Sequence, residues 1–327
     1  MAQDKLDTPA IRQPTAPRWE ENPFEPVISA CNSDPGQIQA ANDTHRSTRN
    51  AQQRAKILNS GFRGWDIDPI LAKLESPERD PEFIDPRNCL VIWARPPALV
   101  QQLVEKVQQE IREVAPSIWF MPLDNLHMTT LELTHSRTKQ EIEDIVATLG
   151  EGVLDIVNYT VSHRARLIKP MLSYDSAGFA LSFVPVAGEN VWSDDTEGGV
   201  NHKYTYHHLR GDIFAMAKAL GADVAPRYTA PSAHLTIGRF ITQEGFTQRR
   251  DGNNELEAVP DRLHIKRFID KVEEINAWLE AEYWPRRDGG GGDWIVGEEK
   301  GLDYQKGTLW YGNGERIMLG KGFNRYN

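Results

Sequence analysis

Two short segments share one pattern and decide how the rest of the chain is interpreted: NLHMTTL at residues 125–131 and AHLTIGRF at residues 233–240. Each contains a histidine and a threonine two positions apart, which are His127 with Thr129 and His234 with Thr236. Their apolar and β-branched neighbours predict a strand for both segments. Because side chains alternate along a strand, the histidine and the threonine of each pair should project from the same face.

The regions around the two motifs repeat one order, which is strand, helix, motif strand, helix. The apolar patterns that predict these flanking elements are at residues 89–94, 98–114 and 139–149 in the first half and 178–186, 203–220 and 263–283 in the second. We therefore expect an α+β fold of two pseudo-symmetric lobes that face one central cleft. Lobe one covers about 88–150, lobe two covers about 175–285, and closing strands follow at about 293–320.

The amino-terminal part of the chain differs from this body in composition. Residues 1–55 are rich in polar residues and proline and show no apolar period, so we expect a disordered or loosely ordered extension. Residues 56–87 contain scattered apolar residues and should pack on the core. Residues 88–327 form the main domain.

Composition limits the partners and the compartment. The chain has 327 residues and a net charge of −10, which argues against a protein that coats a long duplex nucleic acid. The two cysteines, Cys31 and Cys89, are not spaced as a metal site, and three clustered histidines at 202, 207 and 208 do not share a helix face, so we expect neither a metal nor another cofactor. No apolar run is long enough to cross a membrane. We expect a cytoplasmic monomer, with the nucleus as the alternative location.

The residues of the two motifs suit cleavage of a phosphodiester without a metal. One neutral imidazole can remove a proton from the nucleophile, while the other, protonated, donates to the leaving oxygen. The threonine hydroxyls can donate hydrogen bonds to the phosphate oxygens. By strand parity Arg239 should point away from His234 unless a bulge or twist intervenes, and Glu132 should not share the face of His127.

On these segments the chain resembles the two-histidine (2H) phosphoesterase superfamily, and especially its RNA 2′,3′-cyclic phosphodiesterase or "2′-5′ RNA ligase" branch. The resemblance covers about residues 88–320. It implies antiparallel sheets, a water-filled cleft, His127 and His234 as catalytic residues, and Thr129, Thr236 and Arg239 as phosphate-binding residues. It also implies an aromatic side chain that stacks on a base, for which the candidates are Trp119, Phe120, Tyr174, Tyr228 and Phe240.

The expected function is a metal-independent phosphodiesterase that acts on 2′,3′-cyclic phosphates of small nucleotides or of RNA 3′ ends. Two alternatives stay open. The same residues could cleave 3′-5′ or 2′-5′ oligonucleotides, or the cleft could bind a nucleotide or an RNA end without turnover. The sequence does not decide which histidine is the acid and which is the base.

Overall fold

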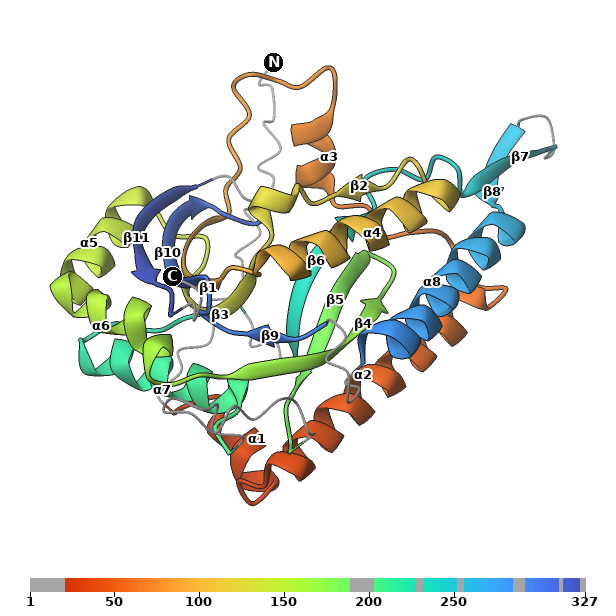
Figure 1. Ribbon diagram of the computed structural model, residues 1–327. Coiled ribbons are helices and arrows are strands. Elements are labelled where there is room, and N and C mark those ends of the chain that lie inside the picture. Colours follow the sequence, from red (N-terminus) through yellow and green to blue (C-terminus); the bar gives the residue numbers. More distant parts are fainter. Residues whose placement is uncertain are drawn as a thin grey trace, which may run out of the picture.

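The computed structural model describes residues 21–188, 203–227, 232–251, 256–284, 292–311 and 314–323. They form an α+β fold, as predicted, with helices packed around antiparallel sheets (Figure 1). The helices, in chain order, are α1 (Glu25–Ala30), α2 (Pro35–Leu58), α3 (Pro69–Glu75), α4 (Ala98–Val114), α5 (Lys139–Leu149), α6 (Val153–Asn158), α7 (Tyr206–Ala219) and α8 (Arg262–Tyr283).

Two sheets carry most of the strands. The four-stranded sheet has the order β11 (Glu315–Lys321), β10 (Lys300–Thr308), β1 (Asn88–Ala94) and β3 (Met128–Thr134). The five-stranded sheet has the order β2 (Trp119–Phe120), β6 (Ala233–Arg239), β5 (Gly178–Pro185), β4 (Arg166–Tyr174) and β9 (Trp294–Ile295). A separate hairpin consists of β7 (Thr247–Asp251) and β8 (Leu256–Pro260). The two larger sheets contact each other along β3 and β6.

The chain exchanges strands between the two larger sheets. Strand β2 lies in the first half of the sequence but pairs with β6 of the second half. The carboxy-terminal region supplies strands, as predicted, and distributes them over both sheets: β9 pairs with β4, and β10 pairs with β1. This exchange ties the two sheets into one body.

Strand β1 is buried on both faces, which explains its continuous apolar sequence. Leu90 and Ile92 point into the main hydrophobic core. Cys89, Val91 and Trp93 point the other way and form a small separate cluster with a residue from the carboxy-terminal region. The alternation of strand side chains therefore places one face of β1 in the core and the other toward the neighbouring pocket.

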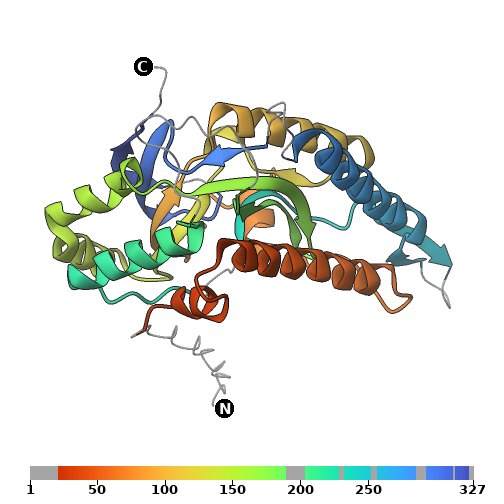
Figure 2. The same ribbon diagram turned by 60° about the horizontal axis from the view of Figure 1, so that its bottom comes forward.

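Helices cover both faces of the five-stranded sheet. Helices α4 and α8 pack against each other on one face, and α2 crosses the other face (Figure 2). The predicted apolar stripe of α8 is buried, including Phe268, Val272 and Leu279. The carboxylate of Asp261 accepts hydrogen bonds from the first backbone amides of the helix, which sets where α8 begins.

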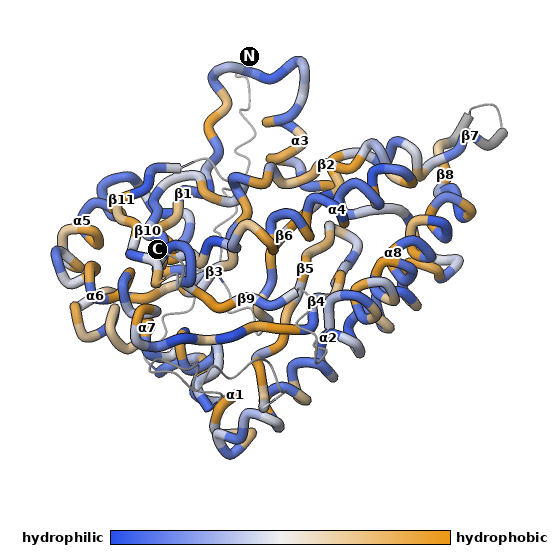
Figure 3. Tube along the Cα trace, viewed as in Figure 1, coloured by the Kyte–Doolittle hydropathy of each residue, from blue (hydrophilic) through white to orange (hydrophobic). Residues whose placement is uncertain are grey.

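Helix α2 contradicts the prediction that residues 1–55 are disordered or loosely ordered. That prediction was wrong for residues 35–55, while residues 1–20 lie outside the described part of the chain. The helix is mostly hydrophilic (Figure 3) because its inner face contacts the sheet through polar side chains. Arg46 donates to the carbonyl of Lys169 at 2.6 Å, and Asn50 donates to the carbonyl of Leu172 at 2.9 Å. An apolar period could not reveal such a helix.

The next segment packs on the core, as expected for residues 56–87. The side chains of Ile57, Phe62, Trp65 and Leu71 are buried there. The backbone amide of Trp65 also donates to the side chain of Gln243 at 3.0 Å, which ties the segment to the chain beyond β6.

Candidate active site

The two motifs meet at one pocket between the sheets. His127, directly before β3, and Thr129 line it from one side, and His234 and Thr236 of β6 line it from the other. The pocket encloses about 1000 Å³ of space, part of which is open to solvent. On β6 the intervening Leu235 is fully buried on the opposite face, as strand alternation requires.

His127 is held by its backbone and by an aromatic ring. Its Nδ1 lies 2.8 Å from the carbonyl oxygen of Asn125, and its ring stacks on Trp93 with centroids 3.9 Å apart and an interplanar angle of 18°. The guanidinium of Arg95 lies 4.7 Å from the Trp93 ring and forms an ion pair with Asp303 at 2.6 Å. These contacts fix the imidazole plane at the pocket wall.

His234 has a matching backbone contact. Its Nδ1 lies 3.2 Å from the carbonyl oxygen of Ser232 and 3.3 Å from the hydroxyl of that residue. In both histidines, therefore, Nδ1 faces a carbonyl two residues earlier in the chain. A carbonyl only accepts hydrogen bonds, so Nδ1 carries the proton of the neutral ring and Nε2 carries the lone pair. The Nε2 atoms of His127 and His234 are thus available to exchange protons with a ligand.

Both imidazoles of the free protein are neutral at neutral pH. Burial lowers the pKa of His127 to about 4, against the opposing effect of the Asn125 carbonyl. Burial also lowers the pKa of His234, and the positive charges of Arg210 and Arg239 lower it further. Because the charge of His234 acts on His127 as well, the two rings disfavour double protonation. An anion bound between them would raise both pKa values.

A bulge in β6 brings Arg239 into the same pocket. Ala180 of β5 pairs with Thr236, but Phe179 pairs with Gly238, so Ile237 is an extra residue in β6. The extra residue reverses the parity of the strand beyond it, and Arg239 consequently lines the pocket with His234. The sequence left this orientation conditional on such a bulge.

The guanidinium of Arg239 has an unmatched donor. Among the residues that the structure describes, no acceptor lies within hydrogen-bonding range of its buried Nε. A buried donor without a partner costs about 1–3 kcal/mol, which an acceptor on a bound ligand would recover. Gly238 has a Phe179 ring atom 2.1 Å from where a Cβ would lie, so only glycine fits this position of the bulge.

Bulges in β3 also correct the prediction for Glu132. Ile92 pairs with Leu131 and Trp93 with Thr129, so Thr130 is an extra residue between them. Glu132 therefore lines the pocket, contrary to the parity argument. Burial raises the pKa of Glu132 to about 7, although the backbone amide of Arg227 donates to its carboxylate at 2.7 Å.

The predicted base-stacking residues have different positions in the structure. Phe240 stacks on Trp65 in the core, with centroids 3.9 Å apart, so it is not available to a ligand. Trp119 and Phe120 do not line the pocket, and Tyr228 lies outside the described residues. Tyr174 lines a neighbouring cavity.

Two tryptophans line the pocket that the sequence analysis did not select. These are Trp93 of β1 and Trp310, which follows β10. Trp93 could have been found from strand parity, because it alternates with the core residues Leu90 and Ile92. Trp310 carries no such signal, since the contact depends on where the carboxy-terminal strands return.

A second cavity adjoins the pocket and shares His234, Thr236 and Arg239 with it. It measures about 1070 Å³, and its outer wall is helix α2. The wall residues from that helix are His45, Arg46 and Arg49. The sequence analysis missed this wall because it did not predict α2.

The clustered histidines near α7 have separate partners. Nε2 of His207 lies 3.1 Å from the side chain of Asn42, and Nδ1 of His208 accepts from the backbone amide of Thr205 at 3.1 Å. His202 lies outside the described residues. The two described histidines serve packing and helix capping.

Comparisons with known proteins assign no family. No family model matches the sequence, and no curated protein matches it with significant similarity. The crystal structure of TT0787 from Thermus thermophilus is similar in fold over 73% of this chain and 100% of that chain, with 12% identity and a TM-score of 0.37. Similarity at this level indicates no function.

Proposed function

We propose that the chain is a phosphodiesterase that opens 2′,3′-cyclic phosphates by histidine acid–base catalysis. The observation that supports this most strongly is the pairing of His127 and His234 in one pocket, each with Nδ1 bonded to a carbonyl and Nε2 available. Binding alone would not require two such proton carriers.

The proposed reaction uses each group of the pocket once. One neutral imidazole removes a proton from the attacking water, and the other donates a proton to the departing ribose oxygen. Each proton transfer contributes about 10²–10⁴-fold in rate. Thr129 and Thr236 donate hydrogen bonds to the non-bridging oxygens, and Arg239 offsets the charge that grows on them.

The protonation states follow from the pocket. The pocket by itself keeps both histidines neutral, so the acid must take up its proton with the substrate. A negatively charged cyclic phosphate between the rings favours this, because an opposite charge raises the pKa of an imidazole. Substrate binding and activation of the acid are therefore coupled.

We also propose that the two larger sheets are pseudo-symmetric lobes of a bilobal body with the site in the cleft between them. Each sheet contributes a bulged motif strand, and each motif histidine bonds the carbonyl two residues before it. This matching supports a common ancestry of the two halves, although strand exchange between the sheets has changed their borders.

The substrate class follows from size and charge. A net charge of −10 opposes a long polyanion but not one local phosphate, so we propose small cyclic nucleotides or RNA 3′ ends as ligands of a cytoplasmic monomer. Among the described residues, no helix is both long and apolar enough to cross a membrane. The pocket and the adjoining cavity leave room on both sides of the phosphate.

The test is a panel of cyclic and linear phosphodiesters with phosphorus NMR detection of products. We expect hydrolysis of a 2′,3′-cyclic nucleotide and a loss of at least about 10³-fold for His127→Ala and for His234→Ala. His264→Ala, on exposed α8, is the matched control and should keep full activity. Near wild-type turnover by both pocket variants would overturn the acid–base assignment. Cleavage of linear oligonucleotides alone would change the substrate class, and cyclic-nucleotide binding without product would indicate a binding module.

A further inference from the structure

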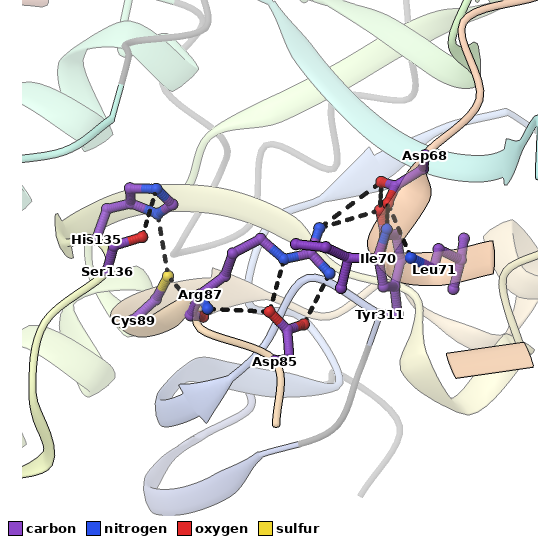
Figure 4. Close-up of polar contacts among 9 residues, drawn as sticks. All are labelled: Asp68, Ile70, Leu71, Asp85, Arg87, Cys89, His135, Ser136 and Tyr311. Carbon is purple, nitrogen blue, oxygen red and sulfur yellow. Dashed lines mark hydrogen bonds and ion pairs between the residues drawn. The ribbon is translucent and has the colours of Figure 1, made fainter. Parts of the chain in front are cut away.

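Three potential metal ligands converge at one end of the pocket. Cys89 is at the start of β1, Glu132 is in β3 and His135 follows β3 directly. Sγ of Cys89 lies 3.3 Å from Nδ1 of His135, and that nitrogen lies 3.7 Å from a carboxylate oxygen of Glu132. All three ligand atoms lie within 4.8 Å of one another. Figure 4 shows the Cys89 thiol and the His135 ring pointing toward each other.

Outer contacts hold these groups in an orientation that suits coordination. Nε2 of His135 lies 2.9 Å from the hydroxyl of Ser136, which can accept its proton and leave the lone pair on Nδ1. The backbone amide of Arg227 donates to one oxygen of Glu132 at 2.7 Å, and the other oxygen faces His135. Metal-binding histidines and carboxylates are generally fixed by such partners.

The spacing of the atoms fits a tetrahedral ion. Zinc binds sulfur at about 2.3 Å and nitrogen or oxygen at about 2.0–2.2 Å, which separates two ligand atoms by about 3.3–3.6 Å. The distances of 3.3 and 3.7 Å at Cys89, His135 and Glu132 are close to this range. Thiolate with imidazole selects zinc and similar ions over magnesium or calcium.

We propose that Cys89, Glu132 and His135 form a binding site for a divalent zinc-like ion on the wall of the pocket. Thiolate and carboxylate supply two negative charges for a divalent cation. The nearby Arg87 is neutralised by Asp85, to which it donates at 2.7 and 2.8 Å (Figure 4). Arg227 opposes the ion, but its guanidinium lies against the Trp310 ring at 4.8 Å.

The thiol is better suited to a metal than to nucleophilic catalysis. Burial raises the pKa of Cys89 to about 12, so the free side chain is protonated at neutral pH. A nucleophilic cysteine needs a lowered pKa, whereas a bound metal ion displaces the thiol proton itself.

The location separates this site from the two histidines. Cys89 and Trp93 are four residues apart on β1, which corresponds to about 13 Å, and Trp93 is the residue that stacks on His127. Cys89 and Glu132 both line the pocket, so the remaining coordination position would face its interior. The proposal does not depend on the phosphodiesterase activity.

Cobalt(II) provides a direct test. The full chain is treated with EDTA, exchanged into metal-free buffer and titrated with Co²⁺. We expect one equivalent to bind with a thiolate-to-cobalt charge-transfer band that Zn²⁺ removes. Cys89→Ser should abolish the band, and His135→Ala should weaken Co²⁺ binding by at least about 100-fold. Cys31→Ser changes the other buried cysteine and is the matched control, which should keep the band.

Two results would overturn the proposal. One is a wild-type chain that gives no charge-transfer band at excess Co²⁺, which would leave the cluster as a hydrogen-bonded thiol and imidazole. The other is a band that survives in Cys89→Ser or moves with Cys31→Ser. Because His135 is only half-buried, His135→Ala should stay folded, and circular dichroism of each variant checks this.

Discussion

The two motif strands present the same pair of side chains to the pocket but hold them differently. On the β3 side, Trp93 stacks on His127, and the nearby Arg95 is already bound to Asp303. On the β6 side, no described aromatic ring stacks on His234, and Arg239 has a buried Nε without a partner among the described residues. The β3 side is thus complete before a ligand binds, whereas the β6 side has a donor that only a ligand would satisfy.

The largest difference should come from the two arginines. Arg239→Met removes a charged donor to the proposed phosphate, worth about 2–3 kcal/mol, and should lower kcat/KM about 30- to 150-fold. Arg95→Met should lower it less than about tenfold, because Arg95 acts on Trp93 and Asp303 rather than on the ligand. Steady-state kinetics on a cyclic nucleotide, with thermal unfolding of both variants, measures this. Equal losses would show that the two sides do not differ as described.

The pH dependence tests the histidines on both sides together. Burial lowers the pKa of His127 to about 4 and lowers that of His234, so above these values the protonated acid becomes scarcer as pH rises. We expect kcat/KM, which reports the free protein, to fall between about pH 5.5 and about pH 7.5 by up to about tenfold per pH unit. A flat profile, or a rise over this interval, would contradict the lowered pKa values.

The smallest effect should come from the ring that positions His127. Trp93→Leu removes a stacking contact worth about 0.5–1.5 kcal/mol and should lower kcat by about two- to tenfold with little change in KM. The double variant with His127→Ala isolates the mechanism, because a residue that acts only through His127 should have no further effect there. An equal loss in both backgrounds would mean that Trp93 contacts the substrate itself.

Local patterns were sufficient for most of the strands and helices. The stripe of α4, which includes Val104, Val107 and Ile111, and the apolar run of β1 are buried where their periods predicted. Helix α2 could not be found in this way, because Arg46 and Asn50 bind strand carbonyls where apolar residues would usually pack. A helix that meets a sheet through hydrogen bonds has no apolar period to detect.

The sequence by itself determined the two motif pairs, because strand alternation places a histidine and a threonine two residues apart on one face. Only the tertiary structure decided that the pairs meet at one pocket, and that Arg239 and Glu132 join them there. The physical reason is the bulges in β6 and β3, each an extra residue that reverses strand parity and is recognisable only from the partner strand. The histidines were thus visible in the sequence, whereas their charged neighbours depended on strand register.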